Sequence, residues 1–473
     1  MFAAFSALSA RGRGAARLAA ATLASGLAAV TVLAGTAAAA PAADTTAPSQ
    51  GGATATIGGL KTYGGAVVHT DSGDQEISAG LFEMSVDGGG MLQTYCVDIH
   101  NPTQRDAKYH ETQWSGTSLG ANEDAGKIRW ILQNSYPQVN DLAALAAKAG
   151  FKGGLTEQDA AAGTQVAIWR YSDGVEVDAV DPQAEKLADY LEKSARGVAE
   201  PEASLTLEPP AVSGHAGERL GPVTVRTDAD GVTLTPPADA ATSGVRIVDK
   251  DGKVVTTAAN GAQVFFDVPE DAADGQAELT VQASTTVPVG RAFAAESRSQ
   301  TQILAGSSES TVSATASATW AETGAIPALS AAENCDKGGV DITAANEGDA
   351  PFTFELLGIE YSIAAGESRT VTVPLQEDQA YDFTIEGPGF EKRFTGVLDC
   401  MTQAGEADAA GTVTQTLDEP SPATVGSASD DTNLAATGGS SMTPLIAGVA
   451  IGFVVLGGAA LVIVRKREAS AQD

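Results

Sequence analysis

The sequence predicts a multidomain protein: an α+β head domain, two all-β domains of the Ig-like sandwich type, and a C-terminal transmembrane segment. Three observations predict this order. Helix and strand patterns are mixed over residues 55–200, whereas only short strand patterns follow over 203–320 and 330–401. An uncharged apolar run then lies at 444–464. With 473 residues, the chain is long enough for several domains of ordinary size.

Residues 1–40 have the pattern of a signal peptide. Three arginines precede an apolar run that begins at Leu18, and the run ends in small residues that suit a signal peptidase. We expect cleavage between Ala39 and Ala43. The alternative is an N-terminal membrane anchor, but the apolar run is short for that role.

The head domain, 55–200, is predicted to begin with a β-hairpin and to continue with four helices. The hairpin turns at Asp87–Gly90 and places Cys96 in its second strand, with Thr94 and Asp98 on the same face. The helical patterns cover residues 122–137, 140–150, 155–174 and 181–197. Residues of the types that cap helix N-termini begin three of them: Asn122, Thr156 and Asp181.

The domain at 330–401 has a cysteine near each end, Cys335 and Cys400. In an exported protein such a pair predicts a disulfide that joins the first and last strands. Closing a loop of this length stabilises a domain by about 4 kcal/mol on the chain-entropy model. The alternative is two free thiols. Lys250 and Lys253 lie in candidate strands of the domain before it and are candidates for isopeptide cross-links, although the sequence does not pair them.

The C-terminal region consists of a low-complexity linker, 402–433, followed by a short motif, the apolar run and a basic tail. The run at 444–464 would be about 30 Å long as a helix, which matches a bilayer core. The motif residues are Leu434, Ala435, Ala436, Thr437 and Gly438.

This order resembles the cell-wall sorting signals of Gram-positive bacteria, and the motif is similar to the LAxTG signals of class E sortases. The resemblance implies cleavage between Thr437 and Gly438, attachment of Thr437 to peptidoglycan, and only a transient membrane intermediate. It therefore implies a secreted protein anchored in the cell wall. The alternative is a plain single-pass membrane protein.

Cys96 has no cysteine partner if Cys335 and Cys400 pair, because the chain has 3 cysteines. It could be a small buried thiol that packs like an apolar residue. An exported free thiol is prone to oxidation, however, so this interpretation leaves the cysteine unexplained.

Gln165 is unusual because its neighbours one helical turn away are all apolar: Ala161, Ala162, Ile168 and Trp169. Its carboxamide therefore lies on the core-facing side of its helix, where an unpaired amide costs about 1–3 kcal/mol. It could be bonded to a neighbouring backbone group. Alternatively, the thiolate of Cys96 could attack the carboxamide, expel ammonia and leave an internal thioester.

Tyr95-Cys96-Val97 and the segment Thr164–Trp169, TQVAIW, resemble the two motifs of bacterial thioester domains. The resemblance covers residues 55–200. It implies a surface adhesin in which the Cys96–Gln165 thioester acylates an amine, such as that of lysine, on a protein of a target surface. Gln165 would be the acyl donor, and Cys96 would leave as a thiolate. The protein would be consumed in the reaction, so it would not be an enzyme.

Two other functions fit the same residues. One is a cysteine hydrolase with Cys96 as nucleophile and His69, His100 or His110 as base. The other is a noncovalent binding or structural wall protein with an inert Cys96. The sequence shows no metal-spaced His/Cys cluster and no phosphate-binding glycine loop, so no cofactor is expected. The net charge of −32 argues against nucleic acid and against anionic membranes as partners.

Overall fold

The structure is a computed structural model that describes residues 45–46, 51–387 and 390–402. The predicted signal peptide, nearly all of the linker, and the sorting signal with its apolar run at 444–464 lie outside the described residues. Within the described residues, no helix is long and apolar enough to cross a membrane.

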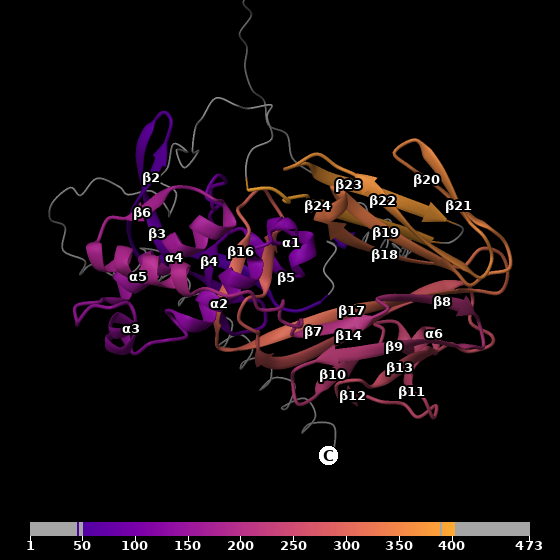
Figure 1. Cartoon of the computed structure of the whole chain (residues 1–473). Helices are drawn as coiled ribbons and strands as arrows, with labels where there is room; N and C mark the ends of the chain where they lie inside the picture. Colours follow the sequence, from indigo (N-terminus) through magenta and orange to yellow (C-terminus); the bar gives the residue numbers. More distant parts are fainter. Residues whose placement is uncertain (1–44, 47–50, 388–389, 403–473) are drawn as a thin grey trace, which may run out of the picture. The chain divides into compact units, whose positions relative to one another are not determined.

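The head is built on a seven-stranded sheet whose strands come from residues 54–112, 177–179 and 292–307 (Figure 1). Its order is β3 (Gly73–Val86), β4 (Met91–Cys96), β16 (Gln302–Ser307), β15 (Ala292–Ala295), β5 (Lys108–Thr112), β2 (Thr54–Thr70) and β6 (Val177–Ala179). The long strand β2 also pairs with β3, so six of the strands form a closed ring. The predicted hairpin turn at Asp87–Gly90 joins β3 to β4.

Strands β15 and β16 correct the predicted domain boundaries. The sequence analysis placed 203–320 in a separate domain, but residues 292–307 pair with β5 and β4 of the head. Both strands are almost wholly buried, so they lack the alternation that would mark a sheet with one exposed face. A short run without alternation does not distinguish a strand from a buried helix and does not identify a pairing partner, so the sequence predicted neither strand. In Figure 1, β16 lies beside β4 although the two are about 200 residues apart.

Helices follow β5 in the chain, and the longest of them packs on β2 and β3. The helical elements are η1 (Trp114–Gly116), α1 (Ser118–Ala121), α2 (Ala125–Asn134), α3 (Leu142–Lys148), α4 (Glu157–Ser172) and α5 (Pro182–Ser194). Helix α5 lies against α4 at close range, because a Cβ added at Gly163 would be only 2.4 Å from the carbonyl oxygen of Ala184.

Two of the three predicted N-caps are present. The Thr156 side chain caps α4 in a capping box with Asp159, and the Asp181 side chain caps α5. The prediction for Asn122 is wrong, because α2 begins after Asp124. Asn122 instead donates from Nδ2 to the carbonyl oxygens of Tyr171 and Ser172, at the end of α4.

The next region contains two sheets, with the orders β12–β10–β14–β17–β8 and β11–β13–β9–β7. Its elements are β7 (Leu205–Glu208), β8 (Ala211–His215), β9 (Arg219–Thr227), β10 (Val232–Thr235), α6 (Ala240–Ser243), β11 (Arg246–Asp249), β12 (Thr257–Ala258), β13 (Gln263–Asp267), β14 (Gly275–Thr286) and β17 (Glu309–Ala321). Buried residues of both sheets and of the head belong to one continuous core. Lys250 and Lys253 are both exposed, so neither is placed for an isopeptide bond protected inside this core.

The last described region is also all β and has its own core. Its elements are β1 (Thr45–Thr46), β18 (Pro327–Asn334), η2 (Cys335–Lys337), β19 (Gly339–Asn346), β20 (Phe352–Leu356), β21 (Ile359–Ile363), β22 (Glu367–Pro374), β23 (Ala380–Gly387) and β24 (Phe390–Val397). The predicted disulfide joins Cys335 to Cys400 with an S–S distance of 2.07 Å. The Ig-like topology of the two β regions stays a prediction.

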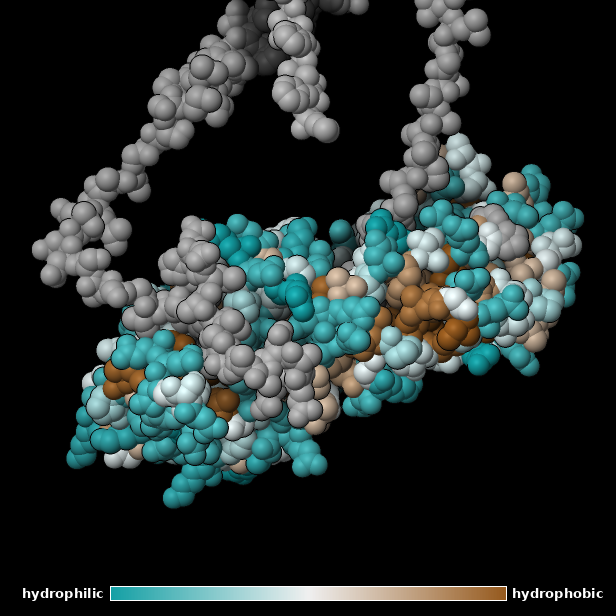
Figure 2. Space-filling view, turned by 90° about the horizontal axis from the view of Figure 1, so that it is seen from above, coloured by the Kyte–Doolittle hydropathy of each residue, from teal (hydrophilic) through white to brown (hydrophobic). Residues whose placement is uncertain are grey.

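The face of the molecule in Figure 2 is mostly hydrophilic where it is coloured. Figure 2 shows a face on which hydrophilic residues surround smaller hydrophobic areas. Among the described residues with large exposed apolar side chains, Leu357 and Ile359 lie together at the turn between β20 and β21.

Candidate functional site

Cys96 is the last residue of β4, at a point where the strand has lost one of its two neighbours. Pairing with β3 ends at Thr94, whereas pairing with β16 continues to the Cys96–Gln302 pair. The N–H of Val97 donates to the carbonyl oxygen of Thr301. Because consecutive residues of a strand direct their polar groups to opposite sides, those of Cys96 face away from β16, toward the side that β3 no longer occupies.

Gln165 on α4 takes the place of the missing strand. Its Oε1 accepts a hydrogen bond from the N–H of Cys96 at 3.1 Å, and its Nε2 donates to the carbonyl oxygen of Cys96 at 2.9 Å. Both residues are buried, with Gln165 0% and Cys96 1% exposed. The two residues that the sequence singles out therefore lie together, and the backbone that satisfies the Gln165 amide is that of Cys96 itself.

Trp169 contacts the sulfur of the pair. Its indole Nε1–H donates to Cys96 Sγ at 3.0 Å. Trp169 is four residues after Gln165, so both side chains lie on the same side of α4. Burial raises the pKa of the Cys96 thiol well above its usual value, and the carboxylate of Asp173 raises it further, whereas the bond from Trp169 acts in the opposite direction.

Helix α4 is fixed by contacts on several sides. Thr164 donates from Oγ1 to the carbonyl oxygen of Ala160 at 2.6 Å and shares a 2.7 Å hydrogen bond with the hydroxyl of Ser135. Arg170 ties the end of the helix to α5 and β6 through four carboxylates, those of Asp178, Glu185, Asp189 and Glu192. These contacts set the position from which Gln165 reaches β4.

Three carboxyl groups lie near the end of β4. Asp98 accepts hydrogen bonds from the backbone N–H groups of His100 and Asn101, and thus holds the turn that follows the strand. Asp173 accepts from the N–H of Ile99 at 3.0 Å. Burial raises the pKa of Asp173 to about 7, and burial together with neighbouring carboxylates raises those of Asp98 and Asp399 well above their usual range. The Asp98 side chain therefore shapes the backbone after Cys96, while its backbone N–H donates to the sulfur and opposes the rise in the thiol pKa.

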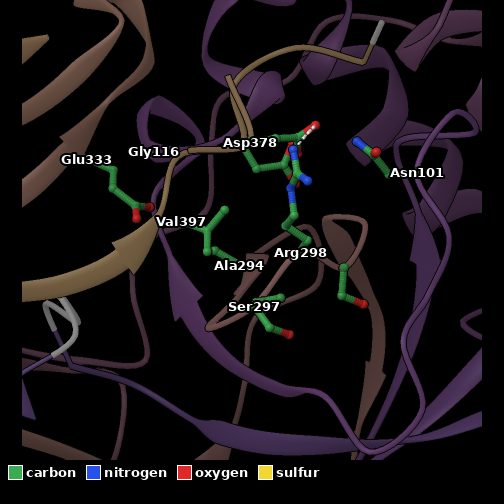
Figure 3. Close-up of a pocket in the computed structure, with 11 residues that line it drawn as sticks. Asn101, Gly116, Ala294, Ser297, Arg298, Glu333, Asp378 and Val397 are labelled. Carbon is green, nitrogen blue, oxygen red and sulfur yellow. Dashed lines mark ion pairs between the residues drawn. The ribbon is translucent and has the colours of Figure 1, made fainter. Parts of the chain in front are cut away.

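A small cavity adjoins Asp399, and Figure 3 shows the residues that line it. It has a volume of about 10 Å³ and is lined by Asn101, Arg298, Asp378 and Asp399, among others. This is about the space that one water molecule needs, so the cavity is too small for a target molecule. Carboxylate oxygens of Glu377, Asp378 and Asp399 lie within 4.8 Å of one another, but Asp378 already pairs with Arg298 at 3.7 Å.

The histidines do not form a catalytic pair with Cys96. No hydrogen bond within the described residues joins a histidine to its sulfur, and His69 instead contacts Asp74 and Asp178. Burial lowers the pKa of His100, and it lowers that of His110 to about 4. The nucleophile–base contact that a cysteine hydrolase needs is therefore not formed.

Sequence reasoning missed one residue beside Cys96. Gln302 on β16 is opposite Cys96 in the strand pair, and its Oε1 accepts a 2.9 Å hydrogen bond from Thr94 Oγ1. No motif connects residue 302 with residue 96, and the predicted head ended at 200. Only the sheet pairing brings Gln302 to the site.

Comparison with protein families gives two matches. Residues 93–197 match the family model of the thioester domain, a span that contains both Cys96 and Gln165. Residues 313–397 match the C-terminal domain of bacterial phospholipase C. No curated protein matches the chain.

Three solved structures that match the chain have low sequence identity to it. The Bacillus anthracis TIE protein is 16% identical, with 66% of this chain and 63% of that chain covered and a TM-score of 0.25. The thioester domain of the Enterococcus faecium TIE86 protein is 16% identical, with 59% and 99% covered and a TM-score of 0.26. The E. coli chaperone DraB is 13% identical, with 41% and 98% covered and a TM-score of 0.17.

TM-scores this low carry no argument, so the assignment rests on the family match and on the site. The match spans the strand end that carries Cys96 and the helix that carries Gln165. In the structure, the side chain of Gln165 is bonded to the backbone of Cys96 in the core of the head. The chain therefore contains a thioester domain.

Proposed function

We propose that the protein is a cell-wall-anchored surface adhesin whose Cys96–Gln165 thioester acylates an amine on a target surface. One observation carries the proposal. The Gln165 carboxamide is held at both ends by the backbone of Cys96 while Trp169 contacts Sγ. This arrangement presents the carbonyl carbon of an otherwise inert amide to the one free thiol of the chain.

Formation of the thioester follows from these contacts. Sγ of Cys96 attacks Cδ of Gln165, the Cδ–Nε2 bond breaks, and the thiol proton leaves with the nitrogen as ammonia. Negative charge develops on Oε1 in the tetrahedral intermediate, where the N–H of Cys96 already donates. The indole N–H of Trp169 stabilises the attacking thiolate.

In the reaction with the target, Sγ of Cys96 is the leaving group and an amine is the nucleophile. An amine nitrogen, such as that of a lysine, attacks Cδ of Gln165 and the Cδ–Sγ bond breaks. The electron pair goes to Sγ, and the proton that the amine loses restores the thiol. The product is an amide between the two proteins, so each molecule reacts once and is not a turnover enzyme. Burial of both residues protects the thioester from water until the target reacts.

The chain termini supply the proposed location. The signal peptide at 1–40 would export the chain, and a class E sortase would cleave between Thr437 and Gly438 and join Thr437 to peptidoglycan. The run at 444–464 would hold the chain in the membrane only until that cleavage. The partners would be an amine-bearing surface protein, the sortase and peptidoglycan, with no nucleic acid and no metal or cofactor.

An amine-capture experiment tests this function. The full chain is incubated with a biotin-linked primary amine, and the label is located by peptide mass spectrometry. We expect label on Gln165 in the parent and none in Cys96→Ala, because an ordinary glutamine amide does not react with amines. Equal labelling of both, or labelling of neither, would favour the alternative of a noncovalent binding protein with an inert cysteine.

A further inference from the structure

We propose that Gln302 donates a hydrogen bond from Nε2 to Cys96 Sγ when that sulfur leaves as a thiolate. This role rests on the proposed function and adds a residue from a distant strand to the same site. Gln302 lies outside the span that matches the thioester-domain family, which ends at residue 197.

The sheet register places Gln302 beside the sulfur. Gln302 is directly opposite Cys96 in the antiparallel pair of β16 and β4. Because the backbone groups of Cys96 face away from β16, this is a non-hydrogen-bonded pair, the type in which opposite Cα atoms come to about 4.5 Å. Opposite residues of a pair extend to the same face of the sheet, so the two side chains are neighbours.

The carboxamide of Gln302 has a hydrogen-bond partner at its oxygen but none within the described residues at its nitrogen. Its Oε1 accepts the hydrogen bond from Thr94, which extends to the same face of β4 two residues before Cys96. Its Nε2 is buried and has no hydrogen-bond partner within the described residues. A buried N–H group without an acceptor costs free energy. A thiolate that forms at Cys96 would supply the acceptor and offset that cost.

The departing thiolate needs such a donor. Cys96 is only 1% exposed, so water contributes little to solvating the charge that appears on Sγ. Burial and the neighbouring carboxylates disfavour that charge, and the indole N–H of Trp169 and the backbone N–H of Asp98 donate against them. A further donor across the strand pair would lower the free energy of the charged sulfur. The N–H of Gln302 stays on its nitrogen throughout, because the proton that restores the thiol comes from the attacking amine.

Opening of the thioester by hydroxylamine tests the role. The full chain is compared with Gln302→Leu, Gln302→Glu and the control Gln93→Leu, and the rate is followed by mass on the molecules that carry the thioester. Gln93 is on β4, the strand of Cys96, but its side chain extends to the opposite face of the sheet. Its replacement therefore tests whether a general disturbance of β4 changes the rate. Thermal unfolding checks that each variant is folded.

We expect opening to slow by roughly tenfold or more in Gln302→Leu at every pH, and to be unchanged in Gln93→Leu. Gln302→Glu should react almost as fast as the parent at acidic pH, where its carboxylic acid can donate. As pH rises and the acid ionises, its rate relative to the parent should fall below that of Gln302→Leu.

A merely structural role would not give this pH dependence. Equal opening rates in the parent and a folded Gln302→Leu would overturn the proposal. If Gln302→Leu does not fold, a rate ratio for Gln302→Glu that stays constant with pH would overturn it instead. Absence of a thioester in the parent would be a different result, because it would contradict the proposed function itself.

Discussion

At the scale of single residues, the site depends on the side-chain amide of Gln165, which forms the two backbone hydrogen bonds that a neighbouring strand would otherwise form. The backbone of Cys96 has lost its partner on the β3 side, and a buried N–H and carbonyl group there would otherwise be unpaired. Gln165 satisfies both groups and thereby holds its carboxamide against the residue that carries the thiol. The pairing that satisfies the backbone is thus also the pairing on which the proposed chemistry depends.

Trp169→Phe should separate the chemistry from the packing. Phenylalanine keeps most of the buried aromatic surface but lacks the Nε1–H that donates to Sγ. A hydrogen bond to a charged group contributes about 1.5–3 kcal/mol, so capture of methylamine should slow by about ten- to a hundredfold while the thioester still forms. The rate is measured by intact mass against time. A rate equal to the parent's would show that this bond has no part in the reaction.

Asp173→Asn should change how stability depends on pH. The pKa of Asp173 is raised from 3.8 to about 7 in the folded chain, so the folded state binds the proton more tightly than the unfolded state. This contribution is complete below about pH 4 and is lost as pH rises through about 7. Relative to the Asn variant, the parent should therefore lose free energy of unfolding between those values. Urea denaturation at several pH values measures the difference, and parallel profiles would refute the assignment.

At the scale of elements, α4 is held by packing more than by its cap. Thr156→Ala removes the capping box and should cost about 1 kcal/mol of free energy of unfolding. We expect the thioester fraction to stay unchanged, because Gln165 lies more than two turns away and Arg170 and Thr164 fix that half of the helix. Asp141→Ala, at the cap of α3, is the matched control and should show a similar loss. A fall in thioester fraction for Thr156→Ala alone would contradict this.

The elements also show what sequence can and cannot predict. The caps at Thr156 and Asp181 and the turn at Asp87–Gly90 depend on neighbours within a few residues, and all three are present. Cys96 and Gln165 could be singled out because each is unusual in its own element. Asn122 was assigned to the wrong helix end because its partners lie about 50 residues further on.

At the scale of the whole molecule, the head is completed by a segment that returns from the next region. Arg291, just before β15, is buried and pairs with the buried Glu111 of β5 at 2.9 Å. Strand β16 then pairs with β4 as far as Cys96, on the edge opposite Gln165. The sequence predicts no strand at either of these two segments, and a local pattern carries no information about a pairing partner about 200 residues away. For this reason the sequence could not show that the head includes residues beyond 200, or that Gln302 lies opposite Cys96.

Fragments of the chain test this architecture. Residues 51–200 lack β15 and β16, which exposes an edge of β4 and leaves Glu111 buried without Arg291. We expect that fragment to show no cooperative unfolding and no thioester, whereas residues 51–321, which keep the shared core, should show both. Circular dichroism and mass spectrometry decide the matter. A stable, thioester-bearing fragment 51–200 would mean that the returning strands are dispensable.

The central claim is that Cys96 and Gln165 are joined, and intact mass tests it most directly. The full chain is compared with Cys96→Ala and Gln165→Ala, so that any processing at either terminus affects all three alike. We predict that only the parent is lighter than its sequence by one ammonia, and that methylamine adds to it alone. A parent of full sequence mass whose Cys96 alkylates after mild unfolding would contradict the thioester and leave a noncovalent surface protein as the account of this chain.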